Sequence, residues 1–494
     1  MSSSGTSSLS PRPWPWVPAI ILFVVCVVWF GRDLDFSAYA HPDERNKINQ
    51  IVQSYYNFNH PLLMLNSARV VAAVSGKTED FEAVKIIGRS VSVFYASISV
   101  GILALVMGRF YGRLVGVAAG LFVLTNPHLF EFAHYFKEEP TVLFGISLTL
   151  LCMLLYSERP GPVTAFLCGA AAGIAFSGKY AGIIVMPFAA YVVLVLSQKK
   201  WRDGVLFIAA FASLFFLINL PALLSINHAV GSLDREVVRL SGAQQEVQKK
   251  IPHGIYTNRY WQSATPVLAG LLFVYALGIY RRRFRLQPFE WALTLIPVVY
   301  FLILSFIPVT SNRYFLPCGV LAACLSAAGL GLLLPLKHGR VVVSVLILIS
   351  LAWQVPELIE ENNGFKLDHL GELKSYLETN LPADAVLFVA KDAAVPPLKI
   401  PRVKYQTIEP GETLESLRQK GFTHILVIPR NYKNFLNQAK NRTRLVDSDF
   451  EKLKFFYESL FSRAVILRDW KEGSNNCLAK AMTLFSLQEN GSRQ

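Results

Sequence analysis

The sequence is poor in charged residues. Asp, Glu, Lys and Arg make up 17% of the 494 residues and 53% are hydrophobic, whereas soluble domains carry about a quarter charged residues. This balance excludes one large soluble core and indicates a polytopic membrane protein. The net charge of +14 would suit a nucleic-acid partner. However, much of the excess lies in short loops between apolar runs, as the positive-inside rule expects of a membrane protein.

Several motifs are also missing. The six cysteines form no CxxC pair and no Cys/His spacing for zinc, which argues against a disulfide framework and against cysteine chemistry. The C-terminal part has no GxGxxG or P-loop, so nothing there supports a nucleotide site. The first apolar run is followed directly by "GRDLDFSAYAHPDE" without a small-residue cleavage site, and we expect an uncleaved anchor.

Long apolar runs fill the first 356 residues. A membrane-spanning helix needs about 20 mostly apolar residues, and this measure predicts about eleven spans. They lie near 14–30, 90–108, 114–130, 141–156, 162–178, 181–197, 204–224, 264–280, 288–307, 315–335 and 341–356. Cationic loops such as "SQKKWRDG" and "RRRFR" alternate with longer or acid-bearing loops. The alternation predicts a cytoplasmic N-terminus, with the acid-bearing loops on the outer side.

The composition changes after about Pro356. "AVLFVA", "THILVIP" and "AVILRDW" are typical of short buried strands, and "ETLESLRQKG" and "FEKLKFFYESLF" of amphipathic helices. We therefore expect a transmembrane domain over 1–356, with an outer loop of about 31–89 that carries surface helices. A small extracytoplasmic α/β domain is expected over 357–494.

Dense polar clusters stand at the outer helix ends. The first holds the adjacent acids Asp43 and Glu44, and the amphipathic segment after it adds His60 in "NFNHPLL". The second is "FKEEP", with Glu138 and Glu139 before a helix. A solvated loop start would also explain the first cluster. A helix cap would also explain one acid of the second.

Cations stand at the same level. Lys179 in "SGKYAG" is alone among some forty otherwise uncharged residues, and Arg313 and Tyr314 lie in "SNRYFLP". His253 and Arg259 belong to the loop "KKIPHGIYTNRYWQ". Lys179 could simply extend to the lipid headgroups, and that loop could be a mere connector. Ionisable residues near membrane depth nevertheless tend to be functional, and we expect these cations to bind an anion.

Carboxylates and cations around one chamber suit a particular reaction. A carboxylate can remove a hydroxyl proton or hold a divalent metal, whereas Lys and Arg can hold a phosphate. Transfer of a sugar from a lipid-linked phosphate to a hydroxyl needs both kinds of group. Its lipid donor would explain why the enzyme lies in the bilayer.

The motif order resembles a known group. It is similar to the GT-C integral-membrane glycosyltransferases, in the branch of the protein O-mannosyltransferases and aminoarabinose (lipid A) transferases. The resemblance covers roughly residues 14–356. It depends on "HPDE" after the first helix, "NHPLL", "KEEP", "SGKYAG" and "NRYFLP".

The resemblance implies roles for individual residues. Asp43 would be the catalytic base with Glu44 as its partner, and Glu139 would be the second acid, with Glu138 as its near rival. Lys179 and Arg313 would hold the phosphate of a polyprenyl donor. The substrate-binding set predicted from all these motifs is His60, Glu138, Lys179, His253, Arg259, Arg313 and Tyr314.

A divalent metal on Asp43 and Glu139 is a further hypothesis. Family members typically invert the anomeric centre, so no covalent intermediate is expected. In this family's "hPPl"-like stretch the present chain has one proline followed by two leucines, and its second acid is Glu where Asp is common.

Two other functions compete with this one. A transporter or lipid flippase would place ionisable residues near the bilayer midplane, often in repeated halves, and neither feature is found. An oligosaccharide polymerase or ligase would share the lipid-linked donor, but it typically uses outer-loop arginines. The expected acceptor is a hydroxyl or phosphate of an extracytoplasmic glycolipid, glycan or protein. The expected location is a bacterial inner membrane.

Overall fold

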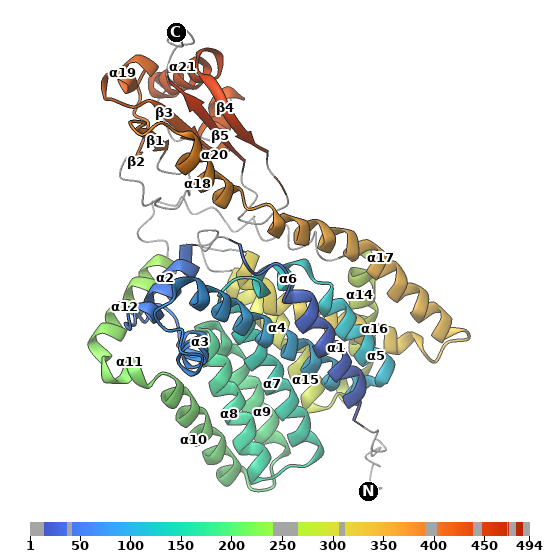
Figure 1. Cartoon of the computed structure of the whole chain (residues 1–494). Helices are drawn as coiled ribbons and strands as arrows, with labels where there is room; N and C mark the ends of the chain where they lie inside the picture. The colour runs from blue at the N-terminus through green and yellow to red at the C-terminus, as the bar shows by residue number, and fades with distance from the viewer. Residues whose placement is uncertain are drawn as a thin grey trace, which may run out of the picture. The chain divides into compact units, whose positions relative to one another are not determined.

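The computed structural model describes residues 14–36, 42–240, 265–305, 312–390, 403–437, 447–471, 473 and 481–487. The chain divides into two compact units (Figure 1). Unit 1 contains residues 1–34 and 43–359, and unit 2 contains residues 35–42 and 360–494. His253 and Arg259, two of the predicted binding residues, lie outside the described residues.

Unit 1 is a helical bundle with many apolar helices. Within the described residues, six helical stretches are long and apolar enough to cross a membrane, and seven if one bent pair counts as a single span. The six are α4 (Phe81–Tyr111), α7 (Glu139–Glu158), α10 (Lys200–Ile218), α15 (Pro288–Ser305), Arg313–Leu333 with α16 (Leu316–Leu333), and Gly339–Asn380 with α17 (Gly339–Lys366). This shows a polytopic helical membrane protein; the count of eleven spans stays a prediction.

The remaining apolar helices of unit 1 are shorter. They are α1 (Trp16–Phe30), α3 (Leu63–Val74), α8 (Pro162–Gly178) and the stretch Tyr180–Leu196, made of η1 (Tyr180–Ile184) and α9 (Val185–Leu196). The predicted break at "SGKY" is confirmed, because Lys179 is extended with φ −162° and ψ 146° between α8 and η1. The outer loop holds α2 (Pro42–Val52) and α3 as separate helices rather than one long helix. The other elements are α11 (Leu220–Leu224), α12 (Ile226–Leu240), α14 (Pro266–Arg282), η2 (Arg283–Arg285) and η3 (Asn312–Phe315).

The run expected at 114–130 is bent. It forms α5 (Arg113–Leu124) and α6 (Pro127–Ala133), which meet at 62°. Pro127 cannot continue a helix from α5 because it lacks an N–H, but it suits the first turn of α6. The Asn126 side chain caps α6 by accepting a hydrogen bond from the Leu129 N–H. The bend directs the chain from α6 towards the start of α7.

Close helix packing positions the ends of α7 and α8, which lie side by side (Figure 1). A Cβ on Gly145 of α7 would lie 2.2 Å from the Cα of Ala175 in α8. A Cβ on Gly169 of α8 would lie 2.0 Å from the carbonyl oxygen of Phe207 in α10. Small residues at these crossings let the backbones approach, as is common in membrane helices.

Unit 2 contains a small mixed five-stranded sheet. Its strands are β1 (Leu387–Ala390), β2 (Val403–Gln406), β3 (His424–Val427), β4 (Val465–Trp470) and β5 (Met482–Ser486), in the order β2-β1-β3-β5-β4. β1 pairs parallel with β2 and β3, whereas β5 pairs antiparallel with β3 and β4. Its helices are α18 (His369–Asn380), α19 (Leu414–Gln419), α20 (Pro429–Leu436) and α21 (Asp447–Arg463).

The side chains of the sheet alternate between two cores. Leu387 and Val389 pack with α18, while Phe388 lies in the core that α19 and α21 share. This is the period of two that a pleated strand imposes. The three predicted strands and two predicted helices coincide with β1, β3, β4, α19 and α21. β2 and β5 were not foreseen.

Candidate functional site

The two acids of "HPDE" point to different surroundings. Glu44 is fully buried and accepts two hydrogen bonds from Arg89 of α4, each of 2.7 Å. It also accepts one of 3.0 Å from the Phe136 backbone N–H. Arg89 in turn donates to the Leu34 carbonyl at 2.6 Å. Glu44 therefore fastens the first turn of α2 to α4 and to the segment before α7.

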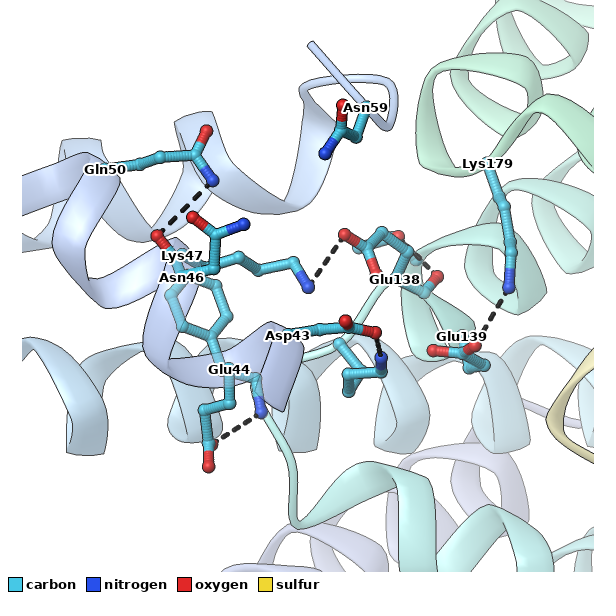
Figure 2. Close-up of polar contacts among 12 residues, drawn as sticks. Asp43, Glu44, Asn46, Lys47, Gln50, Asn59, Glu138, Glu139 and Lys179 are labelled. Atoms are coloured by element: carbon cyan, nitrogen blue, oxygen red, sulfur yellow. Dashed lines mark hydrogen bonds and ion pairs between the residues drawn. The ribbon is translucent and has the colours of Figure 1, made fainter. Parts of the chain in front are cut away.

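Asp43 faces the accessible side of α2. Its side chain is 37% exposed and forms an ion pair with Lys137, which is almost fully buried. Arg313 of η3 donates to the same carboxylate oxygen at 3.2 Å. Figure 2 shows Asp43 between Lys47 and Glu138 on one side and Glu139 with Lys179 on the other. Residues 270 positions apart in sequence thus meet at one carboxylate.

The acids of "KEEP" each have a cation of their own. Glu138 precedes α7, but its side chain makes no capping hydrogen bond. It pairs instead with Lys47 of α2 at 2.9 Å. Glu139 accepts from Lys179 at 2.8 Å and lies 3.8 Å from the Arg313 Nε. Helix capping therefore does not account for Glu138, whereas Glu139 stands in the first turn of α7 and is paired with cations there.

Arg313 bridges the two halves of the site. It lies within ion-pair distance of both Asp43 and Glu139. The Tyr314 ring supports the cations, with the Lys179 Nζ 4.5 Å and the Arg313 Cζ 5.3 Å from its centroid. The other oxygen of Glu139 is buried, and it accepts no hydrogen bond within the described part of the chain.

Burial and neighbouring charges shift the pKa values of the loop groups. Burial raises the pKa of Glu138, but neighbouring cations, Lys47 above all, outweigh this effect and lower the pKa to about 2. Burial lowers the pKa of His60, and burial likewise lowers the pKa of Lys137. Glu138 is consequently a carboxylate at neutral pH and His60 a neutral imidazole.

Beside this charge cluster lies a polar cavity of about 50 Å³. Its walls come from α2, the irregular segment that joins α2 to α3, the first turn of α3 and the residue before α7. They are Asp43, Asn46, Lys47, Gln50, Asn57, Asn59, His60, Pro61, Leu62, Leu65 and Glu138. His60 therefore lies in the same chamber as Asp43, as the sequence suggested.

An apolar groove of about 570 Å³ lies between α14, α15 and α16. Phe273, Phe301 and Ala322 are among the residues that line it. Cys318, which also lines it, lies near the N-terminal end of α16. Cys318 is five residues beyond Arg313, a distance of roughly 8 Å along a helix at 1.5 Å per residue. The groove thus begins close to the cations of the site.

The structure brings together the predicted residues Asp43, His60, Glu138, Glu139, Lys179, Arg313 and Tyr314, with Glu44 buried behind them. Lys47 and Lys137 are members that the predicted set omitted. Lys47 lies one helical turn after Asp43, and this i, i+4 spacing could have indicated it. Lys137 directly precedes the two acids. Arg89 carries no local signal.

The arrangement does not favour a metal ion. Asp43 and Glu139 are each paired with cations, and Arg313 lies between them. Among the residues whose placement is described, no three or more His, Cys, Asp or Glu side chains gather closely enough to hold one. The donor set therefore does not fit the metal hypothesis for Asp43 and Glu139.

Comparison with known proteins matches part of the chain to one family model. Residues 59–223 match the family model for dolichyl-phosphate-mannose-protein mannosyltransferase. The matched segment includes His60, Glu138, Glu139 and Lys179, but neither Asp43 nor Arg313. No curated protein matches the chain.

Several solved structures are similar to the chain to different degrees. An oligosaccharyltransferase from Archaeoglobus fulgidus, solved with Zn and sulfate, is 13% identical with a TM-score of 0.52, over 91% of this chain and 72% of its own. ArnT from Cupriavidus metallidurans is 13% identical with a TM-score of 0.49, over 94% and 97%. The protein O-mannosyltransferase complex of S. cerevisiae is 15% identical with a TM-score of 0.36, over 44% and 34%.

The match over residues 59–223, about a third of the chain, agrees with the resemblance seen in the sequence motifs. The likeness to the archaeal oligosaccharyltransferase is one of fold.

Proposed function

We propose that the chain transfers a sugar from a polyprenyl-phosphate donor to a hydroxyl or phosphate of an extracytoplasmic glycolipid, glycan or protein, with inversion at the anomeric carbon. One observation carries this proposal. Arg313 contacts both Asp43 and Glu139 while Lys179 contacts Glu139, so a base and two phosphate-binding cations occupy one site.

Asp43 is the proposed catalytic base because it is the accessible acid of the pair. Its carboxylate takes the proton of the acceptor hydroxyl as the acceptor oxygen bonds to the anomeric carbon. The bond from that carbon to the phosphate oxygen breaks, and its electron pair leaves with the phosphate. Lys179 and Arg313 stabilise this departing charge. Glu44, buried against Arg89, is a positioning residue.

The resting ion pairs suit this sequence of events. In the free site Arg313 and Lys137 neutralise Asp43, and Lys179 neutralises Glu139. The phosphodiester of the donor carries one negative charge, as a carboxylate does, and competes for the same donors; a second charge develops on it as the sugar leaves. This developing charge would draw Arg313 away from Asp43 and leave the carboxylate free to accept a proton. Glu139 would keep Lys179 oriented towards the phosphate.

The apolar groove is the proposed path of the donor's polyprenyl tail. It begins close to Arg313 and is lined almost wholly by apolar side chains of α14, α15 and α16. A lipid phosphate bound by Arg313 would place its first isoprene units at this entrance. The apolar walls favour the tail because it is removed from water along their length.

Orientation follows from the loops. The site lies at the start of α7 and the end of α8, whereas the Arg-bearing loop "SERPG" joins their opposite ends. Cationic loops favour the cytoplasmic side, so the site is proposed to be extracytoplasmic, in a bacterial inner membrane. We further propose a transmembrane domain over 1–356, crossed about eleven times, and an extracytoplasmic domain over 357–494 that assists acceptor recognition.

A complemented deletion strain tests the proposal. Asp43→Asn keeps the size of the side chain but removes the base, and it should lower transfer by roughly 10²–10⁴-fold. Glycan and lipid analysis should show accumulated polyprenyl-phosphate sugar and one missing sugar on the acceptor, which would also identify both substrates. Glu79→Gln, at an exposed position, should complement fully. Near-normal transfer with Asp43→Asn would rule out the assigned base.

A further inference from the structure

The polar cavity beside Asp43 contains groups that the transfer reaction does not use. Asn46 and Gln50 stand on α2, one and two turns after the residues of "HPDE", and Asn57 and Asn59 lie on the segment opposite. Figure 2 shows Asn46, Lys47 and Gln50 on one side and Asn59 across from them, while Asp43 lies below this group in the view. The cavity thus combines four amide side chains with the proposed base.

Three of the amide side chains hold the walls of the cavity in place. The Gln50 side-chain oxygen accepts from the Asn57 backbone N–H at 3.1 Å, and the Asn57 side-chain oxygen accepts from the Asn59 backbone N–H at 3.2 Å. The Asn46 side-chain oxygen accepts from the Tyr55 hydroxyl at 3.3 Å. These bonds fix the irregular segment against α2. The shape of the cavity therefore exists before any ligand enters.

Two side chains that line the cavity have polar atoms without a hydrogen-bond partner among the described residues. The Asn59 side-chain amide makes no hydrogen bond to the described residues, and neither does the imidazole of His60. An amide offers a donor and an acceptor, and so does a neutral imidazole. A hydroxyl group likewise donates and accepts, so it can satisfy both kinds of group at once.

The cavity wall carries no uncompensated charge. Lys47 pairs with Glu138 at 2.9 Å, and Asp43 pairs with Lys137 and Arg313. Burial lowers the pKa of His60, which keeps its imidazole neutral at pH 7. A ligand ammonium or carboxylate would lose its hydration without gaining a free counter-charge, which is costly. An uncharged polar group meets no such cost.

The size limits what can enter. One water needs roughly 10–15 Å³ by this measure, so a cavity of about 50 Å³ has room for the edge of a sugar ring but not for a whole lipid-linked donor. We propose that this cavity binds a neutral, hydroxyl-bearing edge of a sugar during transfer, with Asn59, Asn46 and His60 as the groups that form hydrogen bonds to it. This proposal rests on the proposed function.

A consequence concerns the class of sugar. The site should prefer a plain hydroxylated sugar to one that carries an amine or a carboxylate at the edge read by the cavity. Both the donor sugar and a sugar acceptor present such hydroxyls. A test must therefore separate these two sources.

Binding to the purified full chain in nanodiscs tests the proposal. The donor probes are undecaprenyl phosphate, its mannose and glucose conjugates, and its 4-amino-4-deoxyarabinose conjugate. Methyl mannoside and methyl glucoside, followed by saturation-transfer NMR, represent an acceptor sugar. The variants are Asn59→Leu and Asn46→Leu. Asn49→Leu is the matched control, because Asn49 is on the same helix but does not line the cavity.

The wild type should bind one hexose conjugate more tightly than the bare lipid phosphate and than the amino-sugar conjugate. Losing one neutral hydrogen bond corresponds to roughly a threefold to tenfold change. Asn59→Leu and Asn46→Leu should each remove that much of the hexose preference and leave the affinity for undecaprenyl phosphate unchanged, which also shows that the variants are folded. Asn49→Leu should match the wild type.

Each other outcome is decisive. If the variants weaken only the methyl glycosides, the cavity reads the acceptor sugar and the proposal holds for that source. If both cavity variants retain every preference, or the wild type prefers the amino sugar, the proposal is overturned while the proposed function stands. If the wild type binds no polyprenyl phosphate at all, the proposed function itself fails.

Discussion

At the scale of single residues, two adjacent acids have different tasks. Asp43 is partly exposed and pairs with Lys137 and Arg313, whereas Glu44 is buried against Arg89 with no exposed surface on either side chain. In an α-helix, consecutive side chains point about 100° apart, and one turn can therefore serve both a chamber and a core. The "HPDE" motif couples a proposed catalytic group to the residue that fixes its position.

Removing the buried partner should be costly. Glu44→Gln leaves the Arg89 guanidinium buried without its counter-charge, and such a loss typically lowers the free energy of unfolding by about 3–5 kcal/mol. Thermal unfolding in detergent, followed by tryptophan fluorescence, would measure the change. Glu378→Gln removes an acid from an exposed pair with Lys374 and should cost less than about 1 kcal/mol.

A double variant separates charge burial from packing. Glu44→Leu with Arg89→Leu removes both charges together and should be more stable than either single variant, because neither ion is left unpaired. A Glu44→Gln protein as stable as the wild type would contradict the assignment of Glu44 as a structural anchor.

His134 should make stability depend on pH. Burial lowers the pKa of His134 from 6.5 to about 4, and its Nδ1 contacts the Phe130 carbonyl at 2.7 Å. Between these pH values the unfolded chain binds the proton and the folded chain does not. The free energy of unfolding should therefore fall as pH falls from 6.5 towards 4, by up to about 3 kcal/mol at 1.36 kcal/mol per unit.

A comparison of two histidine variants isolates this effect. The melting temperature of His134→Gln should decline less between pH 7 and pH 4.5 than that of the wild type. His338→Asn, at an exposed position with φ of 65° that Asn tolerates, should follow the wild-type curve. Parallel curves for all three proteins would show that His134 does not carry the dependence.

At the scale of elements, the packing of α7 on α8 sets the distance between Glu139 and Lys179. Gly145 lies six residues into α7 after Glu139, and the Cα of Ala175 would be 2.2 Å from a Cβ there. Gly145→Ala should lower the free energy of unfolding by about 1–3 kcal/mol through overpacking, although alanine is the better helix former. It should also raise the KM for the lipid donor.

Gly270 in α14 provides the matched control, because a Cβ there meets no atom within 4 Å. Gly270→Ala should be neutral or slightly stabilising, in line with helix propensity alone. Thermal unfolding and donor titration of both variants would measure the difference. If the two substitutions had equal effects, close approach of α7 and α8 would not control the site.

Patterns local in sequence were informative about the elements. The break at "SGKY", the strands β1, β3 and β4 and the helices α19 and α21 follow from apolar runs and punctuating residues. The bend between α5 and α6 was missed, although Asn126 and Pro127 were visible. β2 and β5 were missed, and their pairing depends on residues elsewhere in the chain.

The site was predictable in its members but not in its pairings. Asp43, His60, Glu139, Lys179 and Arg313 could be chosen because charge is rare in this sequence and stands out at helix ends. Which cation meets which acid depends on the tertiary fold. The Lys47–Glu138 pair joins α2 to the start of α7, and no single-sequence pattern specifies that contact.

At the scale of the whole molecule, the proposed function requires one orientation in the membrane. α7 begins at the site with Glu139 and ends at Glu158, next to Arg159; α16 begins beside Arg313 and ends before Lys337 and Arg340. Because cationic loops remain in the cytoplasm, the site-proximal ends of both helices should face outwards. The next helix, α17, should then carry the chain back to the outer side.

Reporter fusions would decide this orientation. Alkaline phosphatase becomes active only outside the cytoplasm. Green fluorescent protein does not fluoresce after export in unfolded form, so its fluorescence marks the cytoplasmic side. A phosphatase fused after Gln494 should be active, because this junction follows an outward crossing. The fluorescent protein fused after Arg159 should be bright, because this junction lies in a cationic loop. The exchanged reporters should both be silent at these junctions.

A fluorescent fusion at Gln494 would place an even number of crossings before it and would separate unit 2 from any extracytoplasmic acceptor. A silent fusion at Arg159 would put the cationic loops outside, and Asp43 and Arg313 would then face a cytoplasmic donor, which would overturn the proposed side of transfer.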